Sequence, residues 1–353
     1  MAATKIVKID PLYPDDKYLK EAAGILAKGG LVIIPTETVY GIAADGSNKK
    51  TLERLYRIKQ RPRDKPLSLL IAKKEKIEEL CQDIPVLAYK LMHKFWPGPL
   101  TIILQSKAGG TLGVRMPDNE VALGVIEMAG IPVVCPSANL SGKPAPIEFK
   151  EAIQDLQGQV DYAMEAGPTR LKQESTVVDL TVQPIKFLRV GAIKEEALES
   201  TIRKKSVLFV CTGNSCRSVM AKAWLEKLMK EKNRQDVEVL SAGIMMMAGL
   251  GASQETTQVL RREGIDVSGH LSQRISPELI NRSDLILVME KLHEERILEM
   301  APQVKNRLFL LKEFAKIEGN HLDIPDPIGR SFEFYERTFE LIREAVERVA
   351  PLI

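Results

Sequence analysis

Short apolar runs alternate with polar segments of helical period along the chain, and this pattern predicts an α/β protein. The runs Gly29–Ile34, Leu100–Leu104 and Val207–Val210 have the length and composition of buried strands. Between the first two, Thr51–Ile58 has apolar residues at positions 52, 55 and 58, which predicts a short helix. The chain contains no internal repeat and no tract of low complexity, so a solenoid is excluded.

The run Val207–Val210 leads into a loop with chemistry of its own. The next eight residues, Cys211–Ser218, read CTGNSCRS, and apolar residues of helical period follow at positions 220, 224 and 228. A strand, loop and helix in this order direct backbone N–H groups and a helix N-terminus at one point, which favours anion binding. Arg217 can fork onto two phosphate oxygens, and the same positive field favours the nucleophilic thiolate of Cys211. A cysteine that merely ends a buried strand is the alternative, but the spacing of the loop favours a phosphatase site.

From about Lys205 to the C-terminus the chain resembles the low-molecular-weight protein phosphatases, which have the arginine phosphatases and the thioredoxin-coupled arsenate reductases as relatives. The likeness includes Ser241-Ala242-Gly243, a strand at 284–289, and Asp326-Pro327-Ile328-Gly329 before a helix at Phe332–Val349. It implies a two-step displacement through a phosphocysteine. The roles that it implies are a nucleophile (Cys211), a phosphate clamp (Arg217), a proton donor to the leaving group (Asp326, with Asp323 as local rival) and support of the loop (Asn214, Ser215, Ser218).

Two departures from the family pattern concern the phosphatase substrate. Ile328 stands where members that act on phosphotyrosine carry an aromatic residue, and Ser215 is small and polar, as in the arginine phosphatases. A hydroxyl at 215 can hydrogen-bond a guanidinium group, so phosphoarginine and phosphotyrosine both stay open as substrates. No cysteine follows Cys216, which argues against an arsenate reductase, although Cys211 and Cys216 could pair reversibly under oxidation.

Polar side chains follow the apolar runs of the first half as well. Hydroxyl, amide or basic residues accompany five of them, within Pro35–Gly41, Gly113–Pro117, Pro136–Gly142, Glu174–Asp179 and Phe187–Gly191. Polar groups gathered at strand ends form the ligand sites of open α/β sheets. The stretch 54–65 also holds six basic residues and one acid, which indicates either a solvated helix end or a polyphosphate patch, and the neighbouring strand ends favour the patch.

From about Lys8 to Gly191 these motifs resemble the YrdC-type L-threonylcarbamoyladenylate synthases. The markers are the stretch 35–41, Lys59-x-Arg61, the stretch 96–101, Val114–Pro117 and Ser137-x-Asn139. The resemblance implies ATP-binding residues (Lys59, Arg61, Thr111, Ser137, Asn139, Arg189) and threonine-binding residues (Thr38, Arg115, Ser175). The chemistry of the charged side chains supports these roles. Lys59 and Arg61 can neutralise a pyrophosphate leaving group, and Arg115 can fork onto a carboxylate.

The resemblance implies a reaction that joins L-threonine, bicarbonate and ATP into threonylcarbamoyl-adenylate and releases pyrophosphate. A separate tRNA threonylcarbamoyltransferase would use this product, so that tRNA is a partner only indirectly. ATP brings Mg²⁺ as part of the substrate, held largely by phosphates and water, and we expect no tightly bound metal. The segment 169–173 departs from the family, whose members often have a glycine-rich stretch there, and residues 68–70 replace a histidine found in many bacterial members.

These observations predict two α/β domains: a YrdC-like twisted mixed sheet with a concave pocket at 1–192, and a doubly wound, mostly parallel sheet at 206–353. The stretch 193–205 is expected to link them. A net charge of +3, with 44% hydrophobic and 27% charged residues, is typical of a globular protein without a strongly basic domain. We expect a cytoplasmic protein without membrane contact, because no apolar run approaches the length of a membrane span. One alternative stays open, in which the first half is an RNA-binding module and the phosphatase is the only catalytic activity.

Overall fold

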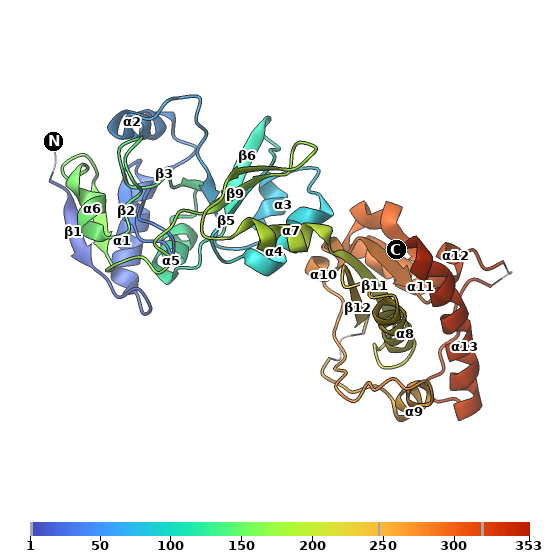
Figure 1. Cartoon of the computed structure of the whole chain (residues 1–353). Coiled ribbons are helices and arrows are strands. Elements are labelled where there is room, and N and C mark those ends of the chain that lie inside the picture. Colours follow the sequence, from blue (N-terminus) through green and yellow to red (C-terminus); the bar gives the residue numbers. More distant parts are fainter. Residues whose placement is uncertain (1–2, 246–247, 319–320) are drawn as a thin grey trace. The chain divides into compact units, whose positions relative to one another are not determined.

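The computed structural model describes residues 3–245, 248–318 and 321–353. The chain divides into two compact units, Met1–Leu198 and Glu199–Ile353 (Figure 1). Helix α7 (Glu195–Arg203) spans this division, so most of the stretch 193–205 that was expected to be a linker is helical.

The described part of the first unit contains a mixed sheet with the strand order β1-β8-β2-β3-β7-β4-β6-β5-β9-β10. Parallel pairs, such as β5 with β9, occur beside antiparallel ones, such as β5 with β6. The predicted twisted mixed sheet is therefore confirmed. The strands are β1 (Lys5–Lys8), β2 (Val32–Ile34), β3 (Gly41–Asp45), β4 (Leu69–Leu70), β5 (Leu100–Gln105), β6 (Thr111–Arg115), β7 (Val133–Val134), β8 (Tyr162–Glu165), β9 (Thr176–Asp179) and β10 (Lys186–Arg189).

Helices cover this sheet because their apolar stripes need a partner surface. Leu26 of α1 and Val125 of α5 lie in one buried cluster with Val32 and Ile34 of β2. Besides α7, the helices of this unit are α1 (Asp16–Ala27), α2 (Lys49–Lys59), α3 (Lys76–Leu80), α4 (Val86–Phe95), α5 (Glu120–Ala129) and α6 (Phe149–Gln154).

The sheet of the second unit has the order β12-β11-β13-β14, and all of its pairs are parallel. The chain crosses from β11 outward to β12 and then back to β13, so the strand order reverses beside β11. Ligands of open parallel sheets bind at such a reversal, beyond the carboxyl ends of the strands, and Cys211 is the last residue of β11. The strands are β11 (Lys205–Cys211), β12 (Val237–Gly243), β13 (Leu285–Val288) and β14 (Leu308–Leu310).

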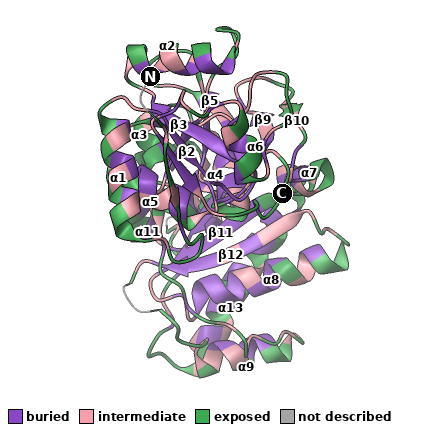
Figure 2. Cartoon of the chain, turned by 90° about the vertical axis from the view of Figure 1, so that its left-hand side faces the viewer, coloured by how far each residue is buried: buried purple, intermediate pink, exposed green. Residues whose placement is uncertain are grey.

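Helices pack on both faces of this sheet, as expected for a doubly wound fold. Successive residues of β11 belong to different cores: Phe209 lies in one cluster with α8 and α13, whereas Val210 lies in another with α10 and α11. Figure 2 shows β11 and β12 as largely buried. The helices are α8 (Arg217–Glu231), α9 (Gln254–Arg262), α10 (Pro277–Asn281), α11 (Lys291–Met300), α12 (Leu311–Phe314) and α13 (Phe332–Val349), with 3₁₀ turns at Pro302–Arg307 and Ala350–Leu352.

Candidate active sites

Lys59 ends helix α2 and is buried, with 1% of its surface exposed. Its ammonium group donates hydrogen bonds to the backbone oxygens of Ser137 and of Asn139, the latter at 2.6 Å. The Ser137 hydroxyl in turn donates to Asn139 Oδ1 at 2.5 Å. Burial, with Arg61 as the next cause, lowers the pKa of Lys59 to about 8. The structure therefore brings three of the predicted ATP residues together around one buried cation.

Arg115, at the buried end of β6, joins the predicted threonine residue Thr38. Its Nη2 donates to Thr38 Oγ1 at 2.9 Å, and its Nε donates to the backbone oxygen of Gly98 at 3.2 Å. The same Nη2 lies 2.7 Å from Oε1 of Glu37, a buried carboxylate that the sequence analysis did not assign. The sequence signal for Glu37 was an acidic residue between two threonines, directly after a buried strand.

Ser175 and Arg189 form a third group at the start of β9 and the end of β10. Arg189 Nη2 donates to Ser175 Oγ at 3.0 Å, and its Nε donates to the backbone oxygen of Ser175 at 2.8 Å. Arg189 also forms an ion pair with Glu174, and the Thr101 hydroxyl lies 2.9 Å from Ser175 Oγ. These contacts hold the Arg189 guanidinium group beside Ser175, one of the predicted threonine-binding residues.

The cations of the first unit act on one another. Burial lowers the pKa of Arg189, Glu174 opposes this shift, and the positive charges of Arg115 and Arg61 add to it. Arg61 likewise contributes to the lowered pKa of Lys59. Four positive charges from distant parts of the sequence therefore lie within electrostatic reach, which is the arrangement that an anionic ligand such as a nucleotide needs.

Two predicted ATP-binding residues, Arg61 and Thr111, lie outside the hydrogen-bonded group around Lys59. The Arg61 guanidinium donates to the backbone oxygens of Lys65 (3.2 Å) and Pro66 (2.8 Å), so it holds the turn after α2. Thr111 is exposed at the start of β6, whereas Arg115 is buried at its end. Four steps along a strand span about 13 Å at about 3.3 Å per residue, so the structure does not bring Thr111 to Arg115.

In the second unit, the loop after β11 folds around the thiol of Cys211. Ser218 Oγ lies 3.0 Å from Cys211 Sγ, and the backbone N–H of Asn214 donates to the sulfur at 3.3 Å. The Asn214 side chain donates to Ser218 Oγ at 2.9 Å and accepts the backbone N–H of Gln273 at 2.9 Å. Asn214 has φ of 55°, a left-handed conformation that asparagine tolerates better than most residues. Asn214 and Ser218 thus surround the sulfur with hydrogen-bonding groups.

Arg217 begins α8 with 1% of its surface exposed and faces two carboxylates. Nη2 lies 2.5 Å from Asp326 Oδ2 and Nη1 lies 3.0 Å from Glu290 Oε2, while Nη1 also donates to the backbone oxygen of Ile324. No described residue accepts a hydrogen bond from the buried Nε. Asp323, the rival acid, instead accepts the backbone N–H of Lys291 at the start of α11. The contacts therefore place Asp326 rather than Asp323 beside Arg217.

Glu290, His293 and Thr212 were not predicted as parts of this site. His293 Nδ1 accepts the backbone N–H of Glu290 at 3.1 Å, so its Nε2 carries the proton and lies 3.0 Å from Thr212 Oγ1. Burial, and next the charge of Arg217, lower the pKa of His293 to about 4, which keeps the ring neutral. Glu290 and His293 occupy ordinary helix-start positions, which carry no signal of an active site, whereas Thr212 lies inside the predicted phosphate loop and could have been found there.

Ser215 and Ile328 flank the site on different segments. The backbone oxygen of Ser215 accepts the N–H of Ser253, and Ile328 is exposed. All four cysteines are free, and Cys216 Sγ lies 3.7 Å from Tyr335 Oη. A reversible Cys211–Cys216 pair thus stays a prediction.

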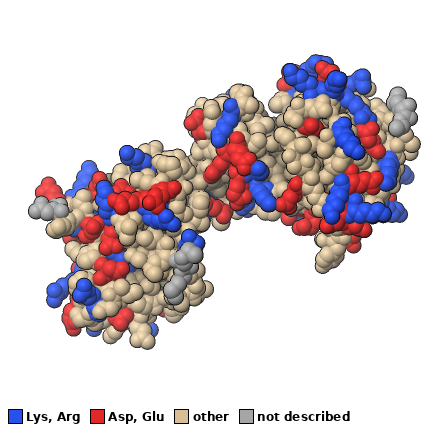
Figure 3. All heavy atoms as spheres, turned by 180° about the vertical axis from the view of Figure 1, so that it is seen from behind, with Lys and Arg blue, Asp and Glu red and all other residues tan. Residues whose placement is uncertain are grey.

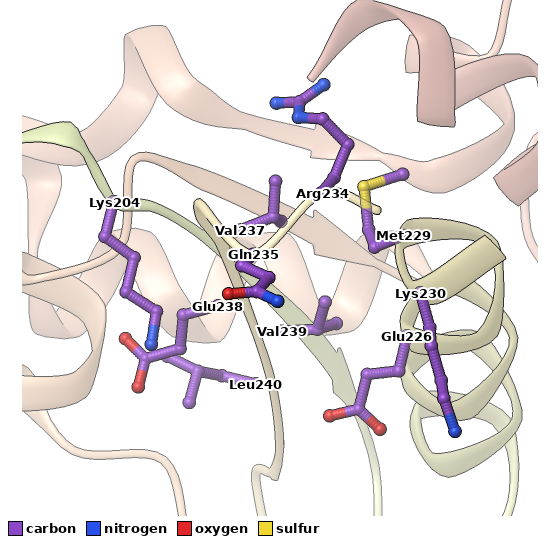
Figure 4. A pocket seen from close by; sticks show the side chains of 10 residues that line it. All are labelled: Lys204, Glu226, Met229, Lys230, Arg234, Gln235, Val237, Glu238, Val239 and Leu240. Carbon is purple, nitrogen blue, oxygen red and sulfur yellow. The ribbon is translucent and has the colours of Figure 1, made fainter. Parts of the chain in front are cut away.

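A separate hollow lies at the other end of the second sheet (Figure 4). Its lining includes Lys204, Val237, Glu238 and Lys230, from the amino end of β12 and the carboxyl end of α8. Gly243, which pairs with Cys211, lies at the opposite end of β12. Because this lining mixes both charge signs and lies away from Cys211, we assign it no part in the phosphate chemistry.

The described residues contain neither a cluster of metal ligands nor a membrane-spanning helix. Acidic and basic side chains are interspersed over much of the face in Figure 3. The described parts of the chain contain no cluster of three or more His, Cys, Asp or Glu side chains that could hold a metal ion. Within those same parts, no helix is long and apolar enough to cross a membrane.

Fold and site together define two classes of protein: a mixed α/β unit with a cluster of buried cationic side chains, and a doubly wound unit with a Cys-x₅-Arg phosphate loop. Residues 24–191 match the family model of the Sua5, YciO and YrdC proteins, described as "Telomere recombination". Residues 206–351 match that of the low molecular weight phosphotyrosine protein phosphatases. The chain belongs to both families, one in each unit.

Individual relatives agree with this assignment. A "Threonylcarbamoyl-AMP synthase" of Pyrococcus abyssi is 41% identical over 193 residues, which are 52% of this chain and 57% of that protein. The crystal structure of P. abyssi Sua5 complexed with L-threonine matches at 30% identity and a TM-score of 0.55, over 69% of this chain and 85% of that one. A Klebsiella pneumoniae protein, "Putative low molecular weight protein-tyrosine-phosphatase", is 35% identical over 40% of this chain and 91% of its own length. The chain spans less than two thirds of the P. abyssi synthase and of a Bacillus subtilis synthase (59%).

Proposed function

We propose that the first unit makes threonylcarbamoyl-adenylate from L-threonine, bicarbonate and ATP. The observation that carries this proposal is a cluster of cationic side chains: Arg61 lowers the pKa of Lys59, Arg61 and Arg115 lower that of Arg189, and Arg115 donates a hydrogen bond to the buried hydroxyl of Thr38. The likeness to proteins named as threonylcarbamoyl-AMP synthases, and to a structure with bound L-threonine, supports the choice of substrates.

In this proposal Arg115 pairs with the threonine carboxylate, and Thr38 and Ser175 line the amino acid. Lys59 and Arg189 supply positive charge to the ATP phosphates, where negative charge develops as pyrophosphate leaves. Ser137 and Asn139 complete the nucleotide side, whereas Arg61 contributes mainly through its charge. Mg²⁺ would arrive with ATP, held by phosphates and water.

The product is a mixed anhydride and therefore an activated acyl donor. A separate tRNA threonylcarbamoyltransferase would consume it, and the chain would meet tRNA only through that partner. The rival proposal, an RNA-binding module without catalysis, needs a broad basic face. The net charge of only +3, from 50 basic and 47 acidic residues, favours the synthase over this rival.

The test of the synthase is pyrophosphate release by the purified chain. We expect release only when threonine, bicarbonate and ATP are all present, because the proposed reaction consumes all three. Lys59→Ala should lower the rate on the order of 100-fold or more. Pyrophosphate that appears equally without threonine would rule out the synthase, and a Lys59→Ala variant with parental rate would remove the basic cluster from ATP binding.

We further propose that the second unit is a cysteine-based protein phosphatase. The Cys211 thiolate attacks phosphorus, the bond to the leaving group breaks, and Asp326 gives that group a proton. Water then attacks the phosphocysteine, Asp326 takes its proton, and phosphate and thiolate are released. Arg217 binds the phosphate oxygens, and its unpartnered Nε offers a donor for them.

The ion pair between Asp326 and Arg217 bears on this mechanism. Asp326 Oδ2 lies 2.5 Å from Nη2 of Arg217, the guanidinium group that this mechanism assigns to the phosphate oxygens. A bound phosphate group competes for Arg217 and loosens this pair. Substrate binding would therefore free the Asp326 carboxyl group to face the leaving group.

The phosphatase test separates activity from substrate choice. Cys211→Ser should abolish hydrolysis of a small aryl phosphate, because an alcohol is a far poorer nucleophile than a thiolate. Ser215→Ile should shift preference from phosphoarginine towards phosphotyrosine by about 10- to 200-fold, since it fills the pocket and deletes a hydrogen-bonding group. An unchanged ratio of the two activities would show that Ser215 does not select the substrate.

A further inference from the structure

Glu37 is a buried carboxylate without a hydrogen-bond donor. Only 2% of its surface is exposed, and no described residue donates a hydrogen bond to either carboxylate oxygen. Its one close charged neighbour is Arg115, with Nη2 at 2.7 Å from Oε1 in a geometry that is an ion pair rather than a hydrogen bond. An unsatisfied buried carboxylate is costly, so it calls for an explanation.

The neighbouring hydroxyl groups cannot satisfy Glu37. Thr36 Oγ1 donates to the backbone oxygen of Val39, so the proton between Thr36 and Thr38 must come from Thr38. Each threonine hydroxyl therefore spends its single proton inside the segment. Any group that satisfies Glu37 must bring N–H or O–H protons of its own.

We propose that Glu37 binds the α-ammonium group of the amino-acid substrate and accepts the proton that this group loses. The proposal rests on the synthase function proposed above. An amino acid carries opposite charges two bonds apart, and Glu37 and Arg115 present opposite charges 2.7 Å apart. With the substrate carboxylate on Arg115, its ammonium group falls within reach of Glu37.

The reaction requires such a proton acceptor. A threonine ammonium ion and bicarbonate yield a carbamate anion, one water molecule and one proton. The new bond joins nitrogen to the carbonate carbon, and one C–O bond of bicarbonate breaks to give the water. The later attack of the carbamate oxygen on the α-phosphorus of ATP releases pyrophosphate without a further proton. One carboxylate beside the nitrogen thus suffices.

A local movement must admit the amino acid, because both oxygens of Glu37 are shut off from solvent. The backbone N–H of Leu171 donates to the backbone oxygen of Glu37 at 2.7 Å. Its neighbour Arg170 forms an exposed ion pair with Asp118. This loop is the segment in which the sequence departs from the glycine-rich family pattern, and its backbone contact with Glu37 makes it the segment that we expect to move.

The experiment compares Glu37→Gln with the parent chain. The control is Glu127→Gln, which removes an exposed carboxylate paired with Lys73. Threonine-dependent pyrophosphate release is measured between pH 7 and pH 9. At pH 7 we expect Glu37→Gln to lose about 100-fold in kcat, and to recover by about tenfold per pH unit as free threonine amine becomes available. The parent and the control should show a much shallower rise.

Binding gives a second readout that does not depend on turnover. The parent should bind L-threonine more tightly than 2,3-dihydroxybutanoate, which lacks the amino group, and Glu37→Gln should lose this preference. Glu37→Asp keeps a carboxylate and should retain the shallow pH profile if the glutamine variant fails to fold.

Two results would overturn the proposal. One is a Glu37→Gln variant with parental kcat. The other is a raised KM for threonine with parental kcat and pH slope, which would mean that Glu37 only orients Arg115. A parent chain that releases no threonine-dependent pyrophosphate contradicts the synthase instead, and the binding comparison still tests Glu37.

Discussion

The buried cation Lys59 has two roles: it holds a neighbouring loop through hydrogen bonds, and it supplies positive charge to the proposed ATP site. Its hydrogen bonds to the backbone oxygens of Ser137 and Asn139 shape the loop on the nucleotide side, while its charge remains available to phosphate. Because burial opposes the charge, the pKa of Lys59 is lowered to about 8, close to working pH. Lys59 is therefore sensitive to pH in a range in which an ordinary lysine, with a pKa of 10.5, is not.

We expect ATP affinity to fall as pH rises above about 8, by roughly tenfold per pH unit once Lys59 is mostly neutral. Calorimetric titration with ATP between pH 7 and pH 9.5 measures this. Lys59→Arg serves as control, because a guanidinium group keeps its charge and should flatten the profile. A parent profile as flat as that of the arginine variant would show that the charge of Lys59 does not bind ATP.

The same shift acts on folding with the opposite sign. The folded pKa is depressed below the ordinary value of 10.5, so between pH 8 and 10.5 the unfolded chain binds more protons at this position. The contribution of Lys59 to the free energy of unfolding therefore rises through that window. Weaker ATP binding at high pH would not reflect loss of the fold through this residue.

Individual site residues could be predicted from the sequence where a motif has a nucleophilic, charged or hydroxyl side chain at the end of a strand. Cys211, Arg217 and Asp326 lie around one point, as do Thr38 with Arg115 and Ser175 with Arg189. Glu37 and Glu290 were missed, because a lone carboxylate in sequence does not show which cation it faces. Thr111 stands apart from Arg115 because strand β6 separates them along its length.

At the scale of elements, the phosphate loop depends on one left-handed residue between β11 and α8. Asn214 adopts φ of 55° and spends its side chain on Ser218 and on the backbone of Gln273. Substitution by glycine deletes both contacts. Substitution by alanine deletes them too, and it keeps the Cβ that makes the left-handed conformation unfavourable.

We expect Asn214→Ala and Asn214→Gly both to slow aryl phosphate hydrolysis, because each frees Ser218 from its brace. The alanine variant should be less stable than the glycine variant by about 1 kcal/mol, the cost of a Cβ in the left-handed region. Denaturant unfolding compares the two. Equal stabilities would mean that the loop relaxes to another conformation when Asn214 is absent.

The elements themselves followed well from period and composition. Helix α13 has the predicted bounds Phe332–Val349, and the predicted helix at 51–58 is the core of α2. The strand order of the mixed sheet did not follow from the pattern, since β4 and β7 have only two residues each and pair through distant contacts. Short strands carry almost no periodic signal of their own.

At the scale of the whole molecule, each unit has its own hydrophobic core and its own site. The buried clusters around β2 and around β11 share no residue. This organisation favours two sites that work independently, although the chain is continuous through α7.

Two glycines offer a matched pair to test this independence. A Cβ on Gly191 would lie 2.1 Å from the backbone oxygen of Glu174, beside the Ser175–Arg189 group. A Cβ on Gly243 would lie 2.8 Å from the backbone oxygen of Thr212, in the phosphate loop. Backbone atoms at these distances must shift, so each substitution to alanine disturbs one site from behind.

We expect Gly191→Ala to lower threonine-dependent pyrophosphate release by at least about tenfold and to leave aryl phosphate hydrolysis at the parental rate. Gly243→Ala should lower aryl phosphate hydrolysis and leave pyrophosphate release at the parental rate. A displacement of the phosphate loop by even about 1 Å costs on the order of 100-fold in rate. Both activities are measured on the same preparations of the full chain. A substitution that lowers both activities while the chain stays folded would show that the two sites are coupled, and the fusion would then have a regulatory meaning that independent cores do not provide.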